Sequence, residues 1–206
     1  MDVFHKHAWY ALVDRIGPRL SAATFDNFEI RNQEQKKLVT ELRGYTEKIA
    51  ENRTAGVNVI LLGTCGVGKD HLSFCVAREA HKAGCSVAWT NGEELFADAR
   101  DSMDGQSTEA ELVYEYTQPD FFWLSDPLPG GAGELTDWQK RLVYRIVDAR
   151  YRMLRPMIVT ANVTSQEEFR QRISQQVADR LLHGAKRWMC KWPSYRQLQS
   201  DGPKTK

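Results

Sequence analysis

A glycine-rich segment, GTCGVGK at residues 63–69, constrains the fold of this chain more than any other stretch. It lies between a short apolar run at 57–62, typical of a buried strand, and a helical pattern at 69–82. Glycines let backbone N–H groups turn inward around a phosphate chain, and the start of a helix adds partial positive charge. The pattern therefore predicts a phosphate-binding loop, with a turn that binds no ligand as the alternative. Its residues are Gly63, Thr64, Cys65, Gly66, Val67, Gly68 and Lys69, the last reaching the terminal phosphates.

Strands and helices are predicted to alternate along the chain. Strands are expected at 57–62, 85–90, 121–124, 156–161 and 187–192. Helices are expected at 33–51, 69–82, 92–103, 107–117, 135–153 and 165–184, the last as one helix or two. This alternation is typical of an α/β fold whose parallel sheet is covered by helices on both faces. With the phosphate loop, it indicates a P-loop nucleotide-binding fold.

Composition excludes several classes of protein. The chain has 206 residues, of which 42% are hydrophobic and 27% charged, as in a soluble globular domain. The first residues lack the apolar core of a signal peptide, and no apolar run approaches a membrane span. The four cysteines form no CxxC pair, so the sequence indicates neither a zinc knuckle nor a disulfide framework. We therefore expect a cytoplasmic protein without membrane partners, and a net charge of +1 excludes coating of nucleic acid by charge alone.

Three segments are expected: a short N-terminal helix and entry segment at 1–24, the nucleotide-binding domain at 25–196, and a basic disordered tail at 197–206. The N-terminal helix is predicted at 5–16, ended by Gly17-Pro18. Its Trp9, Tyr10 and Leu12 either anchor a protein partner or pack on the chain's own core. From residue 181 onward, six lysines and arginines oppose one aspartate, a net charge of +5. Such a charge suits a solvated chain end, and it also suits contact with a phosphate backbone.

The apolar stretch DFFWLSD at 120–126 predicts the strand that brings acidic groups to the phosphates. P-loop ATPases of this kind usually end that strand with two acids, the first for Mg²⁺ and the second for the attacking water. Here the two positions hold Ser125 and Asp126, while Asp70 replaces the hydroxyl usually found after the loop lysine. We interpret Asp70 and Ser125 as the same two groups with their positions exchanged. The candidate metal residues are therefore Asp70, Ser125 and Asp126, and decay of a disused site is the alternative.

A second polar group is expected beside this acid. The strand predicted at 156–161 is followed directly by Asn162. In an open α/β sheet, ligands bind at the carboxyl ends of the strands. We therefore expect Asn162 to orient the attacking water, with Asp126 as the catalytic carboxylate, although an asparagine at a strand end is often only a turn former.

Four motifs occur in a fixed order along the chain. They are the GxxGxGK loop followed by His71-Leu72, the T-x-N strand end at Asn162, V-x-D-R-L at 177–181, and W-x-S-Y-R at 192–196. In this order they resemble the DnaC/IstB-like AAA+ ATPases, the family of bacterial helicase loaders, from about residue 25 to 196. The resemblance implies the AAA+ (ASCE) form of the P-loop fold and ATP with Mg²⁺ as cofactors.

The resemblance also implies roles for individual residues. Arg180 is expected to be an arginine finger, which reaches a neighbour's ATP and stabilises charge on the transferred phosphoryl group. Arg196 is expected to be a second, sensor-like arginine near the phosphates, and Asp70 and His71 complete the nucleotide-binding residues. A finger acts in trans, so a nucleotide-dependent homo-oligomer is expected. A surface salt bridge is the alternative for either arginine.

Three functions fit these patterns. The first is a replicative helicase loader or replication accessory with slow or conditional ATP hydrolysis. The second is a transposition helper that assembles on duplex DNA, and the third is a nucleotide-gated interaction module without significant hydrolysis. Residues 92–117 occupy the place where loaders and initiators touch single-stranded DNA, with Arg100 and Met103 as candidates. That segment also carries many acids and lacks evident stacking aromatics.

Overall fold

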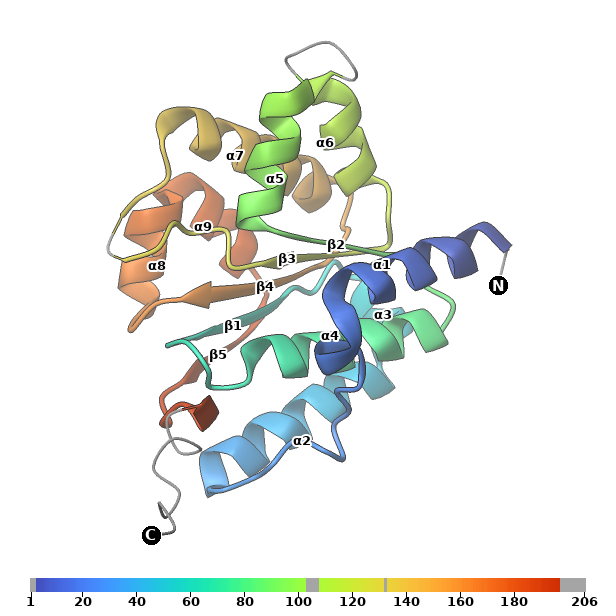
Figure 1. Cartoon of the computed structure of the whole chain (residues 1–206), viewed down its shortest axis with the longest axis vertical. Helices are drawn as coiled ribbons and strands as arrows, with labels where there is room; N and C mark the ends of the chain where they lie inside the picture. Colours follow the sequence, from blue (N-terminus) through green and yellow to red (C-terminus); the bar gives the residue numbers. More distant parts are fainter. Residues whose placement is uncertain (1–2, 103–107, 132, 197–206) are drawn as a thin grey trace, which may run out of the picture.

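The computed structural model describes residues 3–102, 108–131 and 133–196 (Figure 1). A five-stranded parallel sheet lies at its centre, in the order β2-β3-β4-β1-β5. The strands are β1 (Val59–Gly63), β2 (Val87–Asn91), β3 (Phe121–Ser125), β4 (Met157–Asn162) and β5 (Lys186–Cys190). Because β1 pairs with β4 on one side and β5 on the other, the glycine-rich loop leaves from within the sheet.

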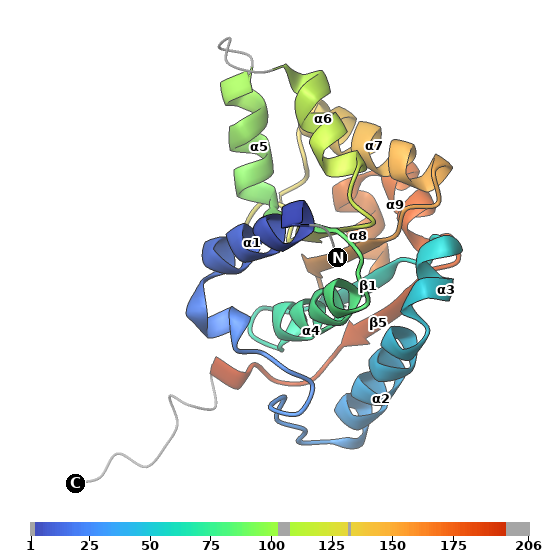
Figure 2. The same cartoon turned by 90° about the vertical axis from the view of Figure 1, so that its right-hand side faces the viewer.

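Helices cover both faces of this sheet, as the sequence predicts (Figures 1 and 2). One face carries α1 (Val3–Ser21), α2 (Gln33–Glu47), α3 (Ile49–Thr54) and α4 (Lys69–Lys82). The other carries α5 (Gly92–Asp101), α6 (Glu109–Thr117), α7 (Asp137–Arg152), α8 (Gln166–Ile173) and α9 (Gln175–Leu182).

Two hydrophobic cores result, one on each face. In β1, Val59 and Leu61 belong to the core under α2 and α4, whereas Ile60 and Leu62 belong to the core under α5–α9. All four side chains are buried. This two-sided burial explains why the central strands read as continuous apolar runs, since among their positions only Asn162, at the end of β4, is not buried.

The N-terminal helix is longer than its sequence predicts. The helix expected to end at Gly17-Pro18 continues to Ser21 through a kink, where Gly17 has φ 76° and ψ 167°. Proline fits the first turn of the second half because its missing N–H is not needed there. The predicted stop is therefore a change of direction, which turns the last helical turn toward the carboxyl edge of the sheet.

Helix α1 packs on the chain's own core, one of the two roles considered for it. The Trp9 ring stacks on His81 with centroids 4.3 Å apart and planes 5° apart, and Leu12 is buried. Tyr10, by contrast, is 65% exposed. Of the three anchor residues considered, two are thus engaged within the chain.

Two long helical patterns are divided in the structure. The helix expected at 33–51 breaks at Lys48, whose φ of −106° and ψ of 29° separate α2 from α3. The pattern at 165–184 divides at Ser174, where φ is 101°. Met103 and the predicted tail at 197–206 lie outside the described residues. Among those that are described, no helix has the length and apolarity needed to cross a membrane.

Candidate nucleotide-binding site

The glycine-rich loop turns from β1 into α4 at the carboxyl edge of the sheet. Gly66 and Gly68 adopt φ of 79° and 91°, which side chains rarely tolerate. A Cβ on Gly66 would lie 2.1 Å from Ser194 Oγ, and one on Gly68 would lie 2.6 Å from the Phe28 ring. Glycine is therefore required at both positions by conformation and by space.

A cleft of about 660 Å³ opens in front of this loop. Its polar end holds the loop and the residues that follow it, and its other end is lined by α1 and the entry segment. The lining residues are Ile16, Arg19, Leu20, Asn27, Phe28, Glu29, Cys65, Gly66, Gly68, Lys69, Asp70, His71, Asp126, Asn162, Tyr195 and Arg196. The cleft thus brings together most of the site residues that the sequence predicts.

Lys69 is buried at the base of the cleft, with 6% of its surface exposed. Its Nζ donates to Gly63 O at 2.9 Å, to Thr64 O at 2.8 Å and to Asn162 Oδ1 at 2.8 Å. An ammonium has three N–H donors, so all three are engaged. Burial lowers the pKa of Lys69, while the neighbouring Asp70 charge opposes that shift. A bound anion would replace these neutral acceptors with charged ones and so favour the ammonium form.

Asp126 and Asn162 face each other across the ends of β3 and β4. Asn162 donates its backbone N–H to Asp126 Oδ1 at 3.1 Å and its side-chain amide to Asp126 Oδ2. Asp126 has a positive φ of 43°, an uncommon backbone for a non-glycine residue. Burial raises the pKa of Asp126. The result is a continuous chain of hydrogen bonds from Lys69 through Asn162 to a carboxylate that takes up a proton more readily than usual.

The structure places Asp70 and Ser125 side by side, as an exchange of positions requires. Ser125 Oγ donates to Asp70 Oδ1 at 2.9 Å, and Thr160 Oγ1 donates to the same oxygen at 3.1 Å. Thr160 Oγ1 also accepts the backbone N–H of Asp126 at 3.2 Å. The sheet register explains this meeting, because Ser125 pairs with Thr160 across β3 and β4.

These oxygens fit a magnesium ion that shares its coordination with phosphate and water. Within the described residues, no group of three or more His, Cys, Asp or Glu could hold a metal alone. Mg²⁺ bound with nucleotides keeps several waters and needs only one or two carboxylates from the protein. Asp70 and Asp126, both adjoining Ser125, satisfy that smaller requirement.

Aromatic side chains join the phosphate loop to the C-terminal segment. His71 Nε2 lies 2.8 Å from Thr24 O, and burial lowers the pKa of His71. Phe28 meets the His71 ring and the Tyr195 ring edge-on, at centroid distances of 5.2 and 5.7 Å. Tyr195 in turn donates its backbone N–H to Gly66 O at 2.9 Å. The motif at 192–196 is therefore part of the loop's support.

Comparison with protein families agrees with this geometry. The family model described as IstB-like ATP binding protein matches residues 16–202. The chain belongs to this family. A replicative helicase loader DnaC from Buchnera aphidicola subsp. Acyrthosiphon pisum is 25% identical over 177 residues, 84% of the chain and 69% of the relative. A putative ATP-binding protein, Rv3427c, in an insertion sequence of Mycobacterium tuberculosis is 24% identical over 155 residues, 73% of the chain and 60% of the relative.

Solved structures establish the fold of this IstB-like chain. A DnaC helicase loader superposes with a TM-score of 0.74 at 20% identity, covering 84% of this chain and 99% of that one. DnaI gives 0.68 at 18% identity, with 86% and 93% covered. A DnaA initiator bound to AMPPCP and single-stranded DNA gives 0.68 at 17% identity, with 86% and 51% covered. The predicted P-loop AAA+ fold and the resemblance to DnaC and IstB proteins are both confirmed.

The two predicted arginines of the IstB-like chain lie in different places. Arg196 lines the cleft, as expected of a residue near phosphates. Arg180 lies on α9, where it donates to Asp148 Oδ1 at 2.8 Å and to the Tyr144 hydroxyl at 2.8 Å. It does not line the chain's own cleft, and a finger that acts in trans need not do so. The role of Arg180 remains a prediction, and the salt bridge considered as its alternative is present.

Arg172 is a site residue that no sequence motif reveals. Its buried side chain donates to Asn162 O at 3.1 Å, to Pro129 O at 2.7 Å and to Gly133 O at 2.9 Å. It thereby fastens the loop after Asp126 to the end of β4. The three acceptors are backbone carbonyls of distant segments, which leave no trace in residue spacing.

Arg100 lies in a neighbouring hollow of about 460 Å³, between the start of α5 and the loop after β3. Asp126 lines this hollow as well as the cleft, so the two meet at the candidate catalytic carboxylate. Arg100 and Phe96 are the cationic and aromatic groups of the hollow. Contact with single-stranded DNA at Arg100 remains a prediction.

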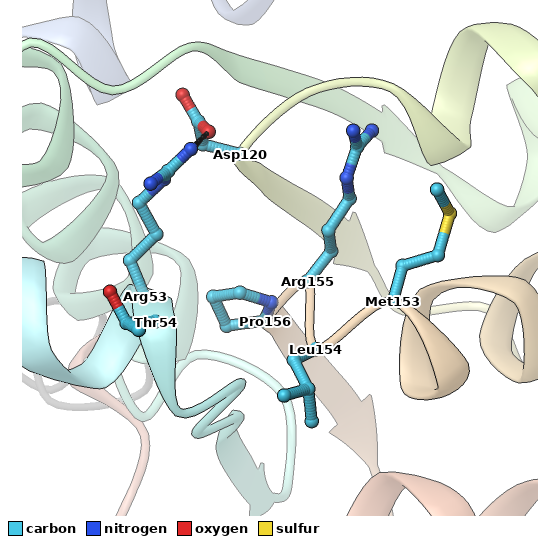
Figure 3. A pocket seen from close by; sticks show the side chains of 7 residues that line it. All are labelled: Arg53, Thr54, Asp120, Met153, Leu154, Arg155 and Pro156. Atoms are coloured by element: carbon cyan, nitrogen blue, oxygen red, sulfur yellow. Dashed lines mark hydrogen bonds and ion pairs between the residues drawn. The ribbon is translucent and has the colours of Figure 1, made fainter.

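A third cavity, of about 230 Å³, lies at the opposite, amino edge of the sheet (Figure 3). Its Arg53 is paired with Asp120, with Nε to Oδ1 at 2.7 Å. Its Arg155 donates to the backbone oxygens of Thr117 and Gln118. Asp120 balances the charge of Arg53, and backbone carbonyls hold one nitrogen of the Arg155 guanidinium. The residues that line this cavity include none of the glycine-rich loop.

Proposed function

We propose that the chain binds ATP with Mg²⁺ in the carboxyl-edge cleft and serves as a loader of a replicative helicase, with slow or conditional hydrolysis. The observation that carries the nucleotide part is the hydrogen-bonded chain Lys69–Asn162–Asp126 in front of the glycine-rich loop. The loader part is supported by similarity over 84% of the chain to a relative named replicative helicase loader.

In this proposal the backbone N–H groups of 64–69 surround the phosphates, and Lys69 binds the terminal ones. His71 and Arg196 line the rest of the nucleotide cleft. Asp70, Ser125 and Asp126 hold the magnesium ion directly or through water. The ion would neutralise charge that develops on the phosphate oxygens during transfer.

Hydrolysis requires the Asp126–Asn162 contact to open. Both carboxylate oxygens of Asp126 accept hydrogen bonds from Asn162, whose amide oxygen is bound to Lys69. When phosphate takes Lys69, the amide oxygen of Asn162 is released, and the side chain can then turn away from Asp126 to orient a water molecule. The water oxygen attacks the terminal phosphorus, its proton passes to Asp126, and the bond to the β-phosphate oxygen breaks. Arg180 of a neighbouring copy stabilises the transferred charge.

The exchange of Asp70 and Ser125 has a direct test. Ser125→Asp alone sets two carboxylates against each other, and Asp70→Thr alone removes the metal-side carboxylate. The double variant Asp70→Thr/Ser125→Asp regains one carboxylate and one hydroxyl. We expect its rate of phosphate release to exceed that of either single variant by about tenfold, a coupling typical of residues in contact. A double variant no faster than the singles contradicts the exchange.

A second function, assistance of a transposase, is favoured by a different observation. The family is IstB-like, and one relative is named for an insertion sequence. ATP hydrolysis measured alone, with single-stranded DNA and with duplex DNA separates the candidates. Stimulation by single strands supports the loader, and stimulation by duplex supports the transposition helper. Tight ATP binding without turnover under all three conditions would instead identify a nucleotide-gated interaction module.

The trans role of Arg180 predicts assembly. Sedimentation with and without a non-hydrolysable ATP analogue should show larger species only with nucleotide. A strict monomer under both conditions counts against a finger at Arg180 and leaves nucleotide binding untouched.

A further inference from the structure

Thr160, the first residue of the T-x-N motif, lies in the middle of the candidate metal cluster, although the sequence assigns it no role. It stands in β4, two residues before Asn162, and is completely buried. Its hydroxyl donates to Asp70 Oδ1 at 3.1 Å and accepts the backbone N–H of Asp126 at 3.2 Å. The same Asp126 N–H also donates to Thr160 O at 3.0 Å. Thr160 therefore contacts the residue proposed as the base through both its backbone and its hydroxyl, and only the hydroxyl reaches the metal-side carboxylate.

Both hydroxyls lie within hydrogen-bond distance of the same oxygen of Asp70, Ser125 Oγ at 2.9 Å and Thr160 Oγ1 at 3.1 Å. The two hydroxyl oxygens are also 3.3 Å apart, a contact in which either can donate. Asp70, Ser125 and Thr160 therefore form one hydrogen-bonded cluster. Among the described residues, no hydrogen bond reaches the other oxygen of Asp70. That oxygen is left available for a cation.

The exchanged positions explain why Asp70 needs this support. A carboxylate at position 125 would be held by the pairing of β3 on both sides. Asp70 is instead an exposed residue in the first turn of α4, where its side-chain torsions are free. Fixing such a side chain requires donors from elsewhere, and Ser125 and Thr160 supply them.

We propose that Thr160 is a positioning residue for the divalent cation: its hydroxyl orients the Asp70 carboxylate and fixes it relative to Asp126. This proposal rests on the proposed nucleotide site. Its signature is a loss confined to the metal-dependent part of nucleotide affinity, because Thr160 lies behind Asp70 and does not line the cleft.

The test compares affinity for a fluorescent non-hydrolysable ATP analogue in EDTA and in Mg²⁺. Thr160→Val keeps the shape and removes the hydroxyl, whereas Thr160→Ser keeps the hydroxyl. Thr90→Val removes the hydroxyl of another fully buried strand threonine, on β2, outside the cluster. The gain is the ratio of nucleotide affinity in Mg²⁺ to nucleotide affinity in EDTA. We expect this ratio to be about tenfold smaller in Thr160→Val, which corresponds to one hydrogen bond to a charged group. Affinity in EDTA should stay within about threefold, and the Thr160→Ser and Thr90→Val proteins should keep the gain.

Each other outcome has one meaning. Equal losses in EDTA and Mg²⁺, or an undiminished gain in Thr160→Val, would overturn the role of Thr160. If urea denaturation finds Thr160→Val unfolded, Thr160→Ala, which also lacks the hydroxyl, takes its place and should show the same selective loss. Failure of the unmodified protein to bind nucleotide would overturn the proposed function itself. Nucleotide binding with no gain from Mg²⁺ in the unmodified protein would overturn the metal cluster.

Discussion

Each edge of the sheet holds a buried cation, and the two cations have different hydrogen-bond partners. The cation of the amino edge, Arg150, is bonded through its two terminal nitrogens, and its buried Nε has no partner among the described residues. At the amino edge, Arg150 on α7 is completely buried. Its NH1 donates to Tyr116 O and Pro119 O, at 2.9 and 3.0 Å, and its NH2 to Asp120 O and Pro156 O, at 3.1 and 2.8 Å. At the carboxyl edge, Lys69 has two carbonyl acceptors and the Asn162 side chain, beside an open cleft.

The difference lies in whether the acceptors can be replaced. Those of Arg150 are backbone oxygens of the segment before β3 and of the residue before β4, so releasing them would separate packed segments. Burial lowers the pKa of Arg150 to about 9, which still leaves it protonated at pH 7. One acceptor of Lys69 is a side-chain amide, and the cleft admits other groups. A cation in a closed cage of carbonyls stabilises the fold, whereas a cation beside a cleft can exchange its partners for a ligand.

The largest expected effect is a loss of stability when Arg150, the buried cation of the amino edge, is replaced. Arg150→Met leaves four backbone oxygens without their donor, and an unsatisfied buried group costs about 1–3 kcal/mol. Removal of a desolvated charge offsets part of this, so we expect a loss of about 3–5 kcal/mol in the free energy of unfolding. Urea denaturation measures it. Arg152→Met, two residues further along α7 and exposed, should change stability by no more than about 0.5 kcal/mol. Equal losses in the two variants would contradict a structural role for Arg150.

Replacing Lys69, the buried cation of the carboxyl edge, should weaken nucleotide binding and leave stability almost unchanged. Lys69→Met removes the charged donor to the phosphates, and we expect nucleotide affinity to fall by about 100-fold or more. The unfolding free energy should change by less than about 1 kcal/mol, because water in the cleft replaces the lost hydrogen bonds. Titration with a fluorescent ATP analogue and urea denaturation of the same preparation check both parts. A stability loss as large as that of Arg150→Met would remove the distinction between the edges.

Much of the fold can be predicted from the sequence because the three central strands, β1, β3 and β4, are buried on both faces. The run at 59–62 is apolar throughout for this reason, and the helix at 69–82 begins directly after the last loop glycine and ends before Ala83-Gly84. The break at Lys48 is different. There Ile49 is buried and Asn52 donates its side-chain amide to Tyr45 O, contacts that depend on tertiary packing. The local sequence pattern therefore does not predict the break.

The candidate site divides in the same way. The phosphate loop is predictable because its chemistry depends on consecutive residues. The meeting of Asp70 with Ser125 is predictable only by analogy with other P-loop proteins, and the structure brings the two together. The contacts of Thr160 and Arg172 escape prediction because they depend on sheet register and on backbone carbonyls of distant segments, although Thr160 belongs to the T-x-N motif.

The smallest expected effect is a pH dependence of stability that arises from His71, at the carboxyl edge of the sheet. Burial lowers the pKa of His71 below its usual 6.5, and the Arg78 charge adds to the shift. The unfolded chain therefore binds more protons than the folded one below about pH 6.5, so stability falls as the pH drops through that value. His71 must donate from Nε2 to Thr24 O, and this bond favours the charged form without reversing the shift.

His71→Gln keeps a donor for Thr24 O but does not titrate. We expect the variant to lose less stability than the unmodified protein when the pH is lowered from about 7.5 to about 5.5, as measured by urea denaturation at both values. Arg78→Gln should act in the same direction with a smaller amplitude, because it removes only the charge contribution and leaves His71 buried. An unmodified protein and a His71→Gln variant with the same acid response would show that this histidine does not couple the carboxyl edge to pH. The acid sensitivity of the chain would then have to come from its carboxylates.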